Sequence, residues 1–211
     1  MKESKKTMIL TSLVCLIPIV IGAILYPQLP EQMVTHWDSA GNPNGYSHKF
    51  TATIVFPGIL LLVNLCFTPL LKMDPKYQNL DEKVKTLLHW LIPIICLFCS
   101  GVTLGDGMGK NLPIPTLGTA LMGVLFIVIG NYMPKISQSY TVGIKLPWTL
   151  YSEENWDKTH RLAGYLWVLT GLIIIVSSFF PWKVWALPAA VLLAIVIPTV
   201  YSYLLYRKMS K

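Results

Sequence analysis

Charged side chains are scarce in this sequence, and six long stretches contain none. Asp, Glu, Lys and Arg make up 13% of the 211 residues, whereas a typical soluble domain is about a quarter charged. A helix needs about 20 apolar residues to cross a hydrocarbon core ~30 Å thick. The sequence therefore predicts an all-α, polytopic membrane protein with six transmembrane helices. The six uncharged stretches are Thr7–Pro30, Phe50–Leu71, Thr86–Gly105, Asn111–Pro134, Leu162–Trp182 and Val184–Tyr206.

The absence of charge inside these stretches also narrows the function. Pumps and proton-coupled carriers usually place an ionisable residue in the middle of the membrane, and no predicted span has an Asp, Glu, Lys or Arg. The chain also shows no nucleophile set of Ser, His and Asp, no paired carboxylates and no zinc-protease motif. We therefore expect neither an enzyme nor a cofactor. A small transporter stays open only as an alternative.

Cysteines are few, and their positions exclude a secreted disulfide framework. All four lie inside predicted spans: Cys15, Cys66, Cys96 and Cys99. The Cys96-Leu-Phe-Cys99 segment has the spacing of a redox motif but no thioredoxin-like sequence around it, so packing is the favoured role.

Basic residues are distributed asymmetrically over the connections between the spans. If the N-terminus is cytoplasmic, fourteen Lys and Arg residues lie on the inner side, and only Lys49, Lys110 and Lys183 lie outside. Cytoplasmic loops carry such an excess of Lys and Arg, so the chain is predicted to have both termini in the cytoplasm. Topology and attraction to anionic membrane lipid account for the net charge of +7, so we expect no nucleic-acid binding.

Two connections are longer than the others, and function concentrates in such loops. Gln28–Lys49 is predicted outside and Lys135–Arg161 inside. Residues 1–71 would form a helix pair with the outer loop, and residues 72–211 a four-helix region, together making one integrated membrane domain. A two-residue turn at Trp182-Lys183 predicts that the last two helices form an antiparallel hairpin.

The outer loop contains the first group of candidate binding residues. Val34–Trp37 has the composition of an extended segment, and Asp38–Gly45 is rich in turn formers. A metal site is conceivable, but the spacing of the histidines and Asp38 matches no zinc pattern, so we expect no metal. The loop is either an interfacial connection or a docking surface with exposed aromatic anchors. The candidates are His36, Trp37, Asp38, Tyr46 and His48.

The inner loop leads into the fifth span. Ser152 is a suitable N-cap, and the acidic residues at 153 and 154 suit the positive end of a helix dipole. Trp156, His160 and Gly164 then share one helix face, and Asp157 and Arg161 are spaced for an ion pair. A helix is therefore predicted to begin in the cytosol and continue into the membrane. This face either packs against the bundle or forms a ligand or partner site.

The two loops resemble the two signatures of the bacterial SdpI family. The outer pattern resembles that family's N-terminal domain of unknown function, and the inner pattern resembles its C-terminal signature. The residues that carry the first are Leu29-Pro30-Glu31, His36-Trp37, Gly41, Pro43, Gly45 and Lys49. The second comprises Gly130-Asn131, Pro134-Lys135, Gly143-Ile144, Pro147-Trp148-Thr149-Leu150, Trp156, Thr159-His160-Arg161 and Gly164.

This resemblance implies an integral immunity protein of the bacterial cytoplasmic membrane. It would protect the cell from a secreted antimicrobial peptide toxin, and it could also be a receptor that holds a cytoplasmic autorepressor at the membrane. The outer-loop candidates would then meet the toxin. The cytoplasmic signature would be structural or bind the partner, with Asn131, Lys135, Lys145, Trp148, Trp156, His160 and Arg161 as its candidates.

The chain departs from the family pattern on the predicted cytoplasmic side. Ser137, Gln138 and Ser139 stand where the family usually has Arg, Pro and Asn, and Lys145 replaces the usual Arg. An arginine offers a planar fork of donors that lysine lacks. The departures therefore concern repressor capture more than toxin resistance.

Overall fold

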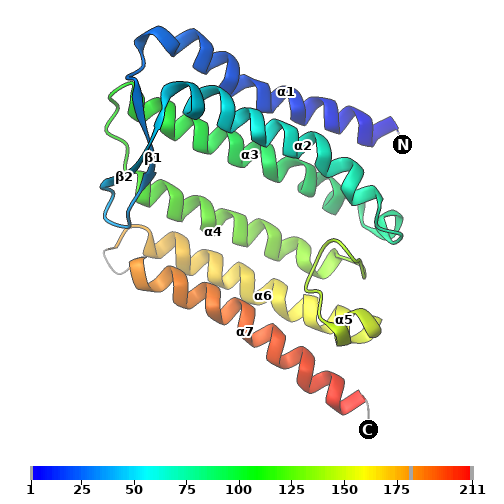
Figure 1. The fold of residues 1–211 in the computed structure, drawn as a ribbon. Helices are drawn as coiled ribbons and strands as arrows, with labels where there is room; N and C mark the ends of the chain where they lie inside the picture. The colour runs from blue at the N-terminus through cyan, green and yellow to red at the C-terminus, as the bar shows by residue number, and fades with distance from the viewer. Residues whose placement is uncertain (1, 181–182, 210–211) are drawn as a thin grey trace. The chain divides into compact units, whose positions relative to one another are not determined.

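A computed structural model describes residues 2–180 and 183–209 (Figure 1). The chain is mostly helical, as predicted, and the long outer connection adds a small β hairpin. In chain order the elements are α1 (Lys2–Leu25), η1 (Tyr26–Gln28), β1 (Gln32–Trp37), β2 (Pro43–His48), η2 (Thr51–Val55), α2 (Phe56–Lys72), η3 (Tyr77–Asn79), α3 (Glu82–Gly107), α4 (Ile114–Tyr132), η4 (Met133–Lys135), α5 (Pro147–Tyr151), α6 (Glu153–Ser177) and α7 (Lys183–Met209).

The six predicted spans are confirmed as six helical segments long and apolar enough to cross a membrane. The fifth differs most from the uncharged stretch. Helix α6 begins at Glu153, before the last charges, because the Ser152 side chain caps it by accepting from the Asn155 amide. The predicted turn at Trp182-Lys183 includes Trp182, which lies outside the described residues. The predicted antiparallel pairing of the last two helices is confirmed, since Asn155 bonds to the Ser202 carbonyl and Trp167 to the Ala194 carbonyl.

The hairpin forms where the sequence predicted an extended segment followed by turn formers. β1 and β2 pair antiparallel, with Met33 opposite Ser47 and Val34 opposite Tyr46. The turn between the strands uses Gly41 at a φ of +94°, a left-handed conformation that glycine adopts without strain. The turn formers at 43–45 belong to β2 and not to the turn.

The chain divides into two compact units. The first comprises residues 1–72 and 85–115, and the second residues 73–84 and 116–211. In the first unit, Leu29, Met33, Ala52 and Leu104 form a buried cluster that joins the hairpin to the helices. Asn64 of α2 donates to the hydroxyls of Thr11 and Ser12 on α1 at 3.2 and 3.1 Å, which satisfies its amide away from water.

The second unit is organised around α4, α6 and α7. Phe126, Ile174, Ala190 and Ala194 form its apolar cluster, and the rings of Phe126 and Trp167 stack with centroids 4.8 Å apart. The segment between α4 and α6, residues 136–152, folds at one end of this unit. We call these residues the junction loop.

Candidate functional site

Asp38, one of the outer-loop candidates, folds the hairpin turn. Its carboxylate accepts from the amides of Ala40 and Asn42 at 2.9 and 2.8 Å, and from the Asn42 side chain at 3.1 Å. These bonds, those of Asn42 first, hold the pKa of the Asp38 carboxyl below its usual value. The oxygens of the carboxylate are therefore already hydrogen-bonded within the turn.

The two histidines of the hairpin contact different partners. His36 Nδ1 lies 2.5 Å from Asn44 Oδ1, across the two strands. His48 Nε2 lies 3.1 Å from the Glu31 carboxylate, which Lys49 also contacts at 2.9 Å. The hydrogen bond and charge of Lys49 are the main reasons that the pKa of Glu31 is lowered. Over residues 2–180 and 183–209, no three His, Cys, Asp or Glu side chains are grouped to hold a metal ion.

The aromatic candidates of the hairpin differ in exposure. Tyr46 is 61% exposed and pairs with Val34, so it projects from the sheet face opposite Met33. Trp37 is half-buried at the end of β1. Among the five predicted residues, Tyr46 thus offers the largest open aromatic surface.

The hairpin is fixed to the helices of its own unit. Met33 is 1% exposed and packs so close to α3 that a Cβ on Gly107 would lie 2.7 Å from its Cε. At the turn, a Cβ on Gly41 would lie 3.1 Å from the Pro115 ring. Both contacts leave little room for movement, so the strands present their outer face in a defined position.

Asp74, which the sequence did not single out, organises the junction loop in the second unit. Asp74 is 5% exposed, and its carboxylate accepts five hydrogen bonds, from Lys76 N, Ser139 Oγ, Tyr140 N, Thr141 N and Thr141 Oγ1. Burial would raise the pKa of Asp74, but these bonds outweigh it and lower the pKa to about 2. The ionised carboxylate therefore ties the α2–α3 connection to the junction loop.

Trp156 and His160 lie on one face of α6, as predicted, and there their rings stack and are buried. They are 0% and 1% exposed, with ring centroids 4.1 Å apart. Trp156 donates to the Ile136 carbonyl at 2.7 Å. His160 Nδ1 lies 2.8 Å from the Trp156 carbonyl, and Nε2 accepts from the Ile144 amide at 2.9 Å. A carbonyl only accepts and an amide only donates, so this geometry specifies the neutral imidazole. The face packs against the junction loop through Ile136 and Ile144.

Trp148 anchors the short helix α5 to the end of α7. Its Nε1 donates to Ser202 Oγ at 2.8 Å, and its ring lies edge-on to Tyr203 and stacks with Tyr206. Asn155, fully buried, reaches the same turn of α7 through the Ser202 carbonyl. Ser202 thus joins three elements of the unit.

The remaining signature candidates lie on the surface. Asn131, Lys135, Lys145 and Arg161 are all exposed. Lys135 lies over the Tyr132 ring, and Lys145 donates to the Thr141 carbonyl at 3.1 Å. Within the described part of α6, the i,i+4 ion pair joins Glu154 and Lys158, and the predicted Asp157–Arg161 pair does not form.

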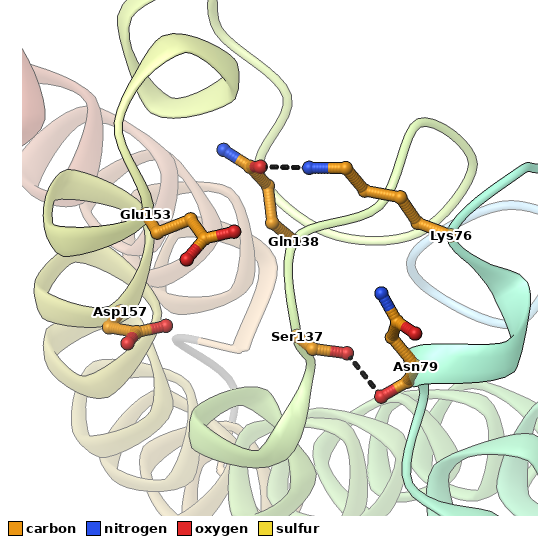
Figure 2. A pocket seen from close by; sticks show the side chains of 6 residues that line it. All are labelled: Lys76, Asn79, Ser137, Gln138, Glu153 and Asp157. Atoms are coloured by element: carbon orange, nitrogen blue, oxygen red, sulfur yellow. Dashed lines mark hydrogen bonds between the residues drawn. The ribbon is translucent and has the colours of Figure 1, made fainter.

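A polar pocket lies beside the junction loop (Figure 2). Its volume is about 210 Å³, and its lining consists of Lys76, Asn79, Ser137, Gln138, Glu153 and Asp157. Lys76 bonds to the Gln138 side chain, and Ser137 donates to the Asn79 carbonyl at 2.7 Å. Gln138 also donates to the carbonyls of Thr149 and Leu150. Two of the departures from the family pattern, Ser137 and Gln138, therefore line this pocket.

The contacts inside each unit agree with six membrane crossings. Two crossings, α3 and α4, separate Asp74 from Ser139, so a chain that crosses six times places both on one side, where they bond. Two crossings also separate Gly41 from Pro115, and these residues are in contact. The fold therefore defines a multi-pass helical membrane protein with a structured β hairpin in one connection and a folded junction loop in another.

Comparison with known proteins places this architecture in one family. Residues 135–202 match the SdpI/YfhL protein family, and residues 13–61 match a domain of unknown function, DUF1648. The chain is 32% identical over 209 residues to "Immunity protein SdpI" of Bacillus subtilis (strain 168), covering 98% of each chain. No solved structure matches. The protein belongs to the SdpI/YfhL family.

Proposed function

We propose that this protein is an immunity protein of the bacterial cytoplasmic membrane, which protects its cell from a secreted peptide toxin. The similarity to immunity protein SdpI over 98% of both chains carries this proposal. Both signature regions fold in the structure, one as the hairpin and one as the junction loop with the start of α6. The activity is thus that of a binding protein and not of an enzyme.

The hairpin is the proposed recognition surface. The bias of fourteen basic residues against three supports an orientation with both termini in the cytoplasm and the hairpin outside. A toxin that acts on the membrane must pass the interfacial layer, where Tyr46 projects from a sheet held rigidly by Met33 and Gly41. Asp38 bonds to the turn and His48 to Glu31, so these two side chains shape the surface. His36, Trp37 and Tyr46 are the proposed contacts with the toxin.

The junction loop is proposed to stabilise the second unit. The half-buried Trp148 of this loop, and the buried Trp156 and His160 of α6 that face the loop, all have partners inside the protein. Their exposed neighbours, such as Lys145 and Arg161, are the signature residues available to a cytoplasmic partner.

A second candidate function is a signalling receptor that sequesters a cytoplasmic repressor. The observation that favours it is the polar pocket of Figure 2, which would face the cytosol in the predicted orientation and exposes the carboxylates of Glu153 and Asp157. A repressor surface rich in Lys or Arg would complement these carboxylates.

Expression in a toxin-sensitive bacterium tests the main proposal. Cells that carry the gene should survive higher doses of a candidate secreted peptide than cells with an empty vector. A reporter for the neighbouring operon, measured in the same cells, tests the receptor role separately. If the inserted protein is present at normal level and shifts neither the killing curve for any candidate peptide nor the reporter, both proposals are wrong.

A further inference from the structure

The polar pocket of Figure 2 presents unfilled hydrogen-bond acceptors and a net negative charge. Its lining carries one ammonium group, that of Lys76, and two carboxylates, those of Glu153 and Asp157. Within the part of the chain that the structure describes, neither carboxylate has a hydrogen bond or an ion pair. The donors of Lys76 and Ser137, in contrast, are already bonded inside the protein. An occupant of the pocket must therefore supply donors and positive charge.

The two carboxylates enter the pocket from one face of α6. Glu153 and Asp157 are four residues apart in this helix, and side chains at that spacing have Cβ atoms about 5–6 Å apart. Figure 2 shows both side chains directed from α6 toward the segment that carries Ser137 and Gln138. The side chain of Asn79 lies on the far wall and offers a further acceptor oxygen. One ligand between these walls can reach both carboxylates.

The size and charge of the pocket select a small planar cation. Its volume of about 210 Å³ is below the ~300–1,000 Å³ of most small-molecule sites, so it suits the tip of one side chain. A divalent metal ion needs about six oxygen ligands, and here the Lys76 ammonium in the lining repels it. A guanidinium group has five donors in a plane and is weakly hydrated, whereas a second ammonium is a strongly hydrated point charge.

We propose that this pocket binds one guanidinium group, from an arginine side chain of a cytoplasmic protein or from a free arginine-like compound. The donor edges of the group pair with Glu153 and Asp157, as guanidinium and carboxylate groups commonly do. The choice of a protein partner rests on the proposed receptor role. The affinity of the pocket for the group itself does not depend on that role.

Binding of a blocked arginine to the purified full chain tests the proposal. The protein is placed in nanodiscs of phosphatidylcholine, which has no net charge, and N-acetyl-arginine methylamide is titrated while its NMR line width is followed. N-acetyl-lysine methylamide, of equal charge, and free arginine are titrated in parallel. We expect the blocked arginine to bind about threefold more tightly than the blocked lysine, because its fork reaches both carboxylates and one partly exposed ion pair contributes about a factor of two to five.

The two forms of arginine distinguish the source of the guanidinium group. Binding of the blocked form assigns the group to a protein side chain, and binding of free arginine alone assigns it to a small metabolite. Both results support a guanidinium site.

Matched variants locate the site. Asp157→Asn should weaken binding about threefold, and the double variant Glu153→Gln, Asp157→Asn about tenfold. The control Glu154→Gln removes a carboxylate of the same helix turn that pairs with Lys158 and is not among the described lining residues, so binding should change little. Lys76→Gln should tighten binding, because it removes a like charge. Thermal unfolding of each variant shows whether it is folded.

Four results would overturn the proposal: no binding of either form of arginine, equal binding of blocked arginine and blocked lysine, displacement of blocked arginine by an equal concentration of Mg²⁺, or unchanged binding in the folded double variant. The operon reporter separates this inference from the receptor role. Arginine binding with an unresponsive reporter keeps the guanidinium site and removes the receptor role. A responsive reporter without arginine binding keeps the receptor role and removes the guanidinium site.

Discussion

Gly130 of α4 and Gly164 of α6 face each other with no room for a side chain on either. A Cβ on Gly130 would lie 3.0 Å from the Gly164 carbonyl oxygen, and a Cβ on Gly164 would lie 2.8 Å from the Gly130 carbonyl oxygen. Gly123 and Gly171 repeat the contact farther along the same two helices. Helices in lipid associate mainly through close packing, and small residues permit the closest approach. These glycines therefore hold α4 against α6.

Gly164→Ala is expected to destabilise the protein by about 1–3 kcal/mol, the usual cost of overpacking a tight contact. Thermal unfolding in detergent and membrane abundance would measure it. Gly118→Ala is the control, because a Cβ at Gly118 meets nothing within 4 Å and alanine favours helix. Equal effects of the two substitutions would show that the close contact is not what holds these helices.

Trp156→Ala is expected to lower abundance in the membrane strongly, since truncating a buried Trp typically costs about 3–5 kcal/mol. His160→Ala should also lower abundance, because this substitution leaves the Ile144 amide without its acceptor. Arg161→Ala, on the exposed side of the helix, is the control. Quantitative immunoblotting of membrane fractions gives the answer. Normal abundance with lost protection would make this face a functional site and not a packing surface.

Asp74 is expected to make stability depend on pH. Its folded pKa of about 2 lies below the ordinary value of 3.8, so its contribution is complete above about pH 4 and is lost as the pH falls through about 2. The difference corresponds to about 2 kcal/mol. Unfolding temperatures of the wild type and Asp74→Asn should differ at pH 7 and converge toward pH 2. The control Asp157→Asn alters an exposed carboxylate and should change little at any pH. Parallel curves for wild type and Asp74→Asn would contradict this assignment.

The orientation is expected to have the hairpin outside. Single cysteines at Ser39 and Lys145, both exposed, would be labelled by a membrane-impermeant thiol reagent in intact cells. Ser39→Cys should react at once and Lys145→Cys only after the cells are opened. The unaltered protein, with its four native cysteines, gives the background. Labelling in the reverse order would invert the topology and remove the hairpin from contact with any external toxin.

The hairpin is expected to carry recognition through its aromatic residues. Tyr46→Ala should reduce protection while leaving the protein folded, because a binding anchor often contributes about 2 kcal/mol, or roughly a thirtyfold change in affinity. Trp37→Ala and the pair His36→Ala, Tyr46→Ala should act in the same direction. Tyr165→Ala, an exposed tyrosine of α6, is the matched control in a dose-response for killing. If all hairpin variants protect fully at normal abundance, the hairpin only connects two helices and does not recognise the toxin.

The sequence predicted local features of the site more accurately than distant ones. The Ser152 cap and the shared face of Trp156 and His160 depend on residues within about two helix turns, so pattern alone was sufficient. The role of Asp74 was not predictable, because its partner Ser139 is 65 residues away and nothing in the neighbourhood of Asp74 indicates a buried carboxylate. The Asp157–Arg161 spacing was correct for an ion pair, but Lys158 and Glu154 formed the pair in that helix.

The amino-acid sequence by itself determined the six helical spans, because transfer of each uncharged stretch into lipid is favourable residue by residue and needs no partner elsewhere in the chain. It also determined the extended start of the hairpin and its turn-rich region. Only the tertiary structure decided that α3 groups with α1 and α2, that Asp38 is occupied by its own turn while Tyr46 stays open, and that Gly130 meets Gly164. Such choices depend on which surfaces meet across the fold, and the packing energy of a contact exists only once both of its sides are in place.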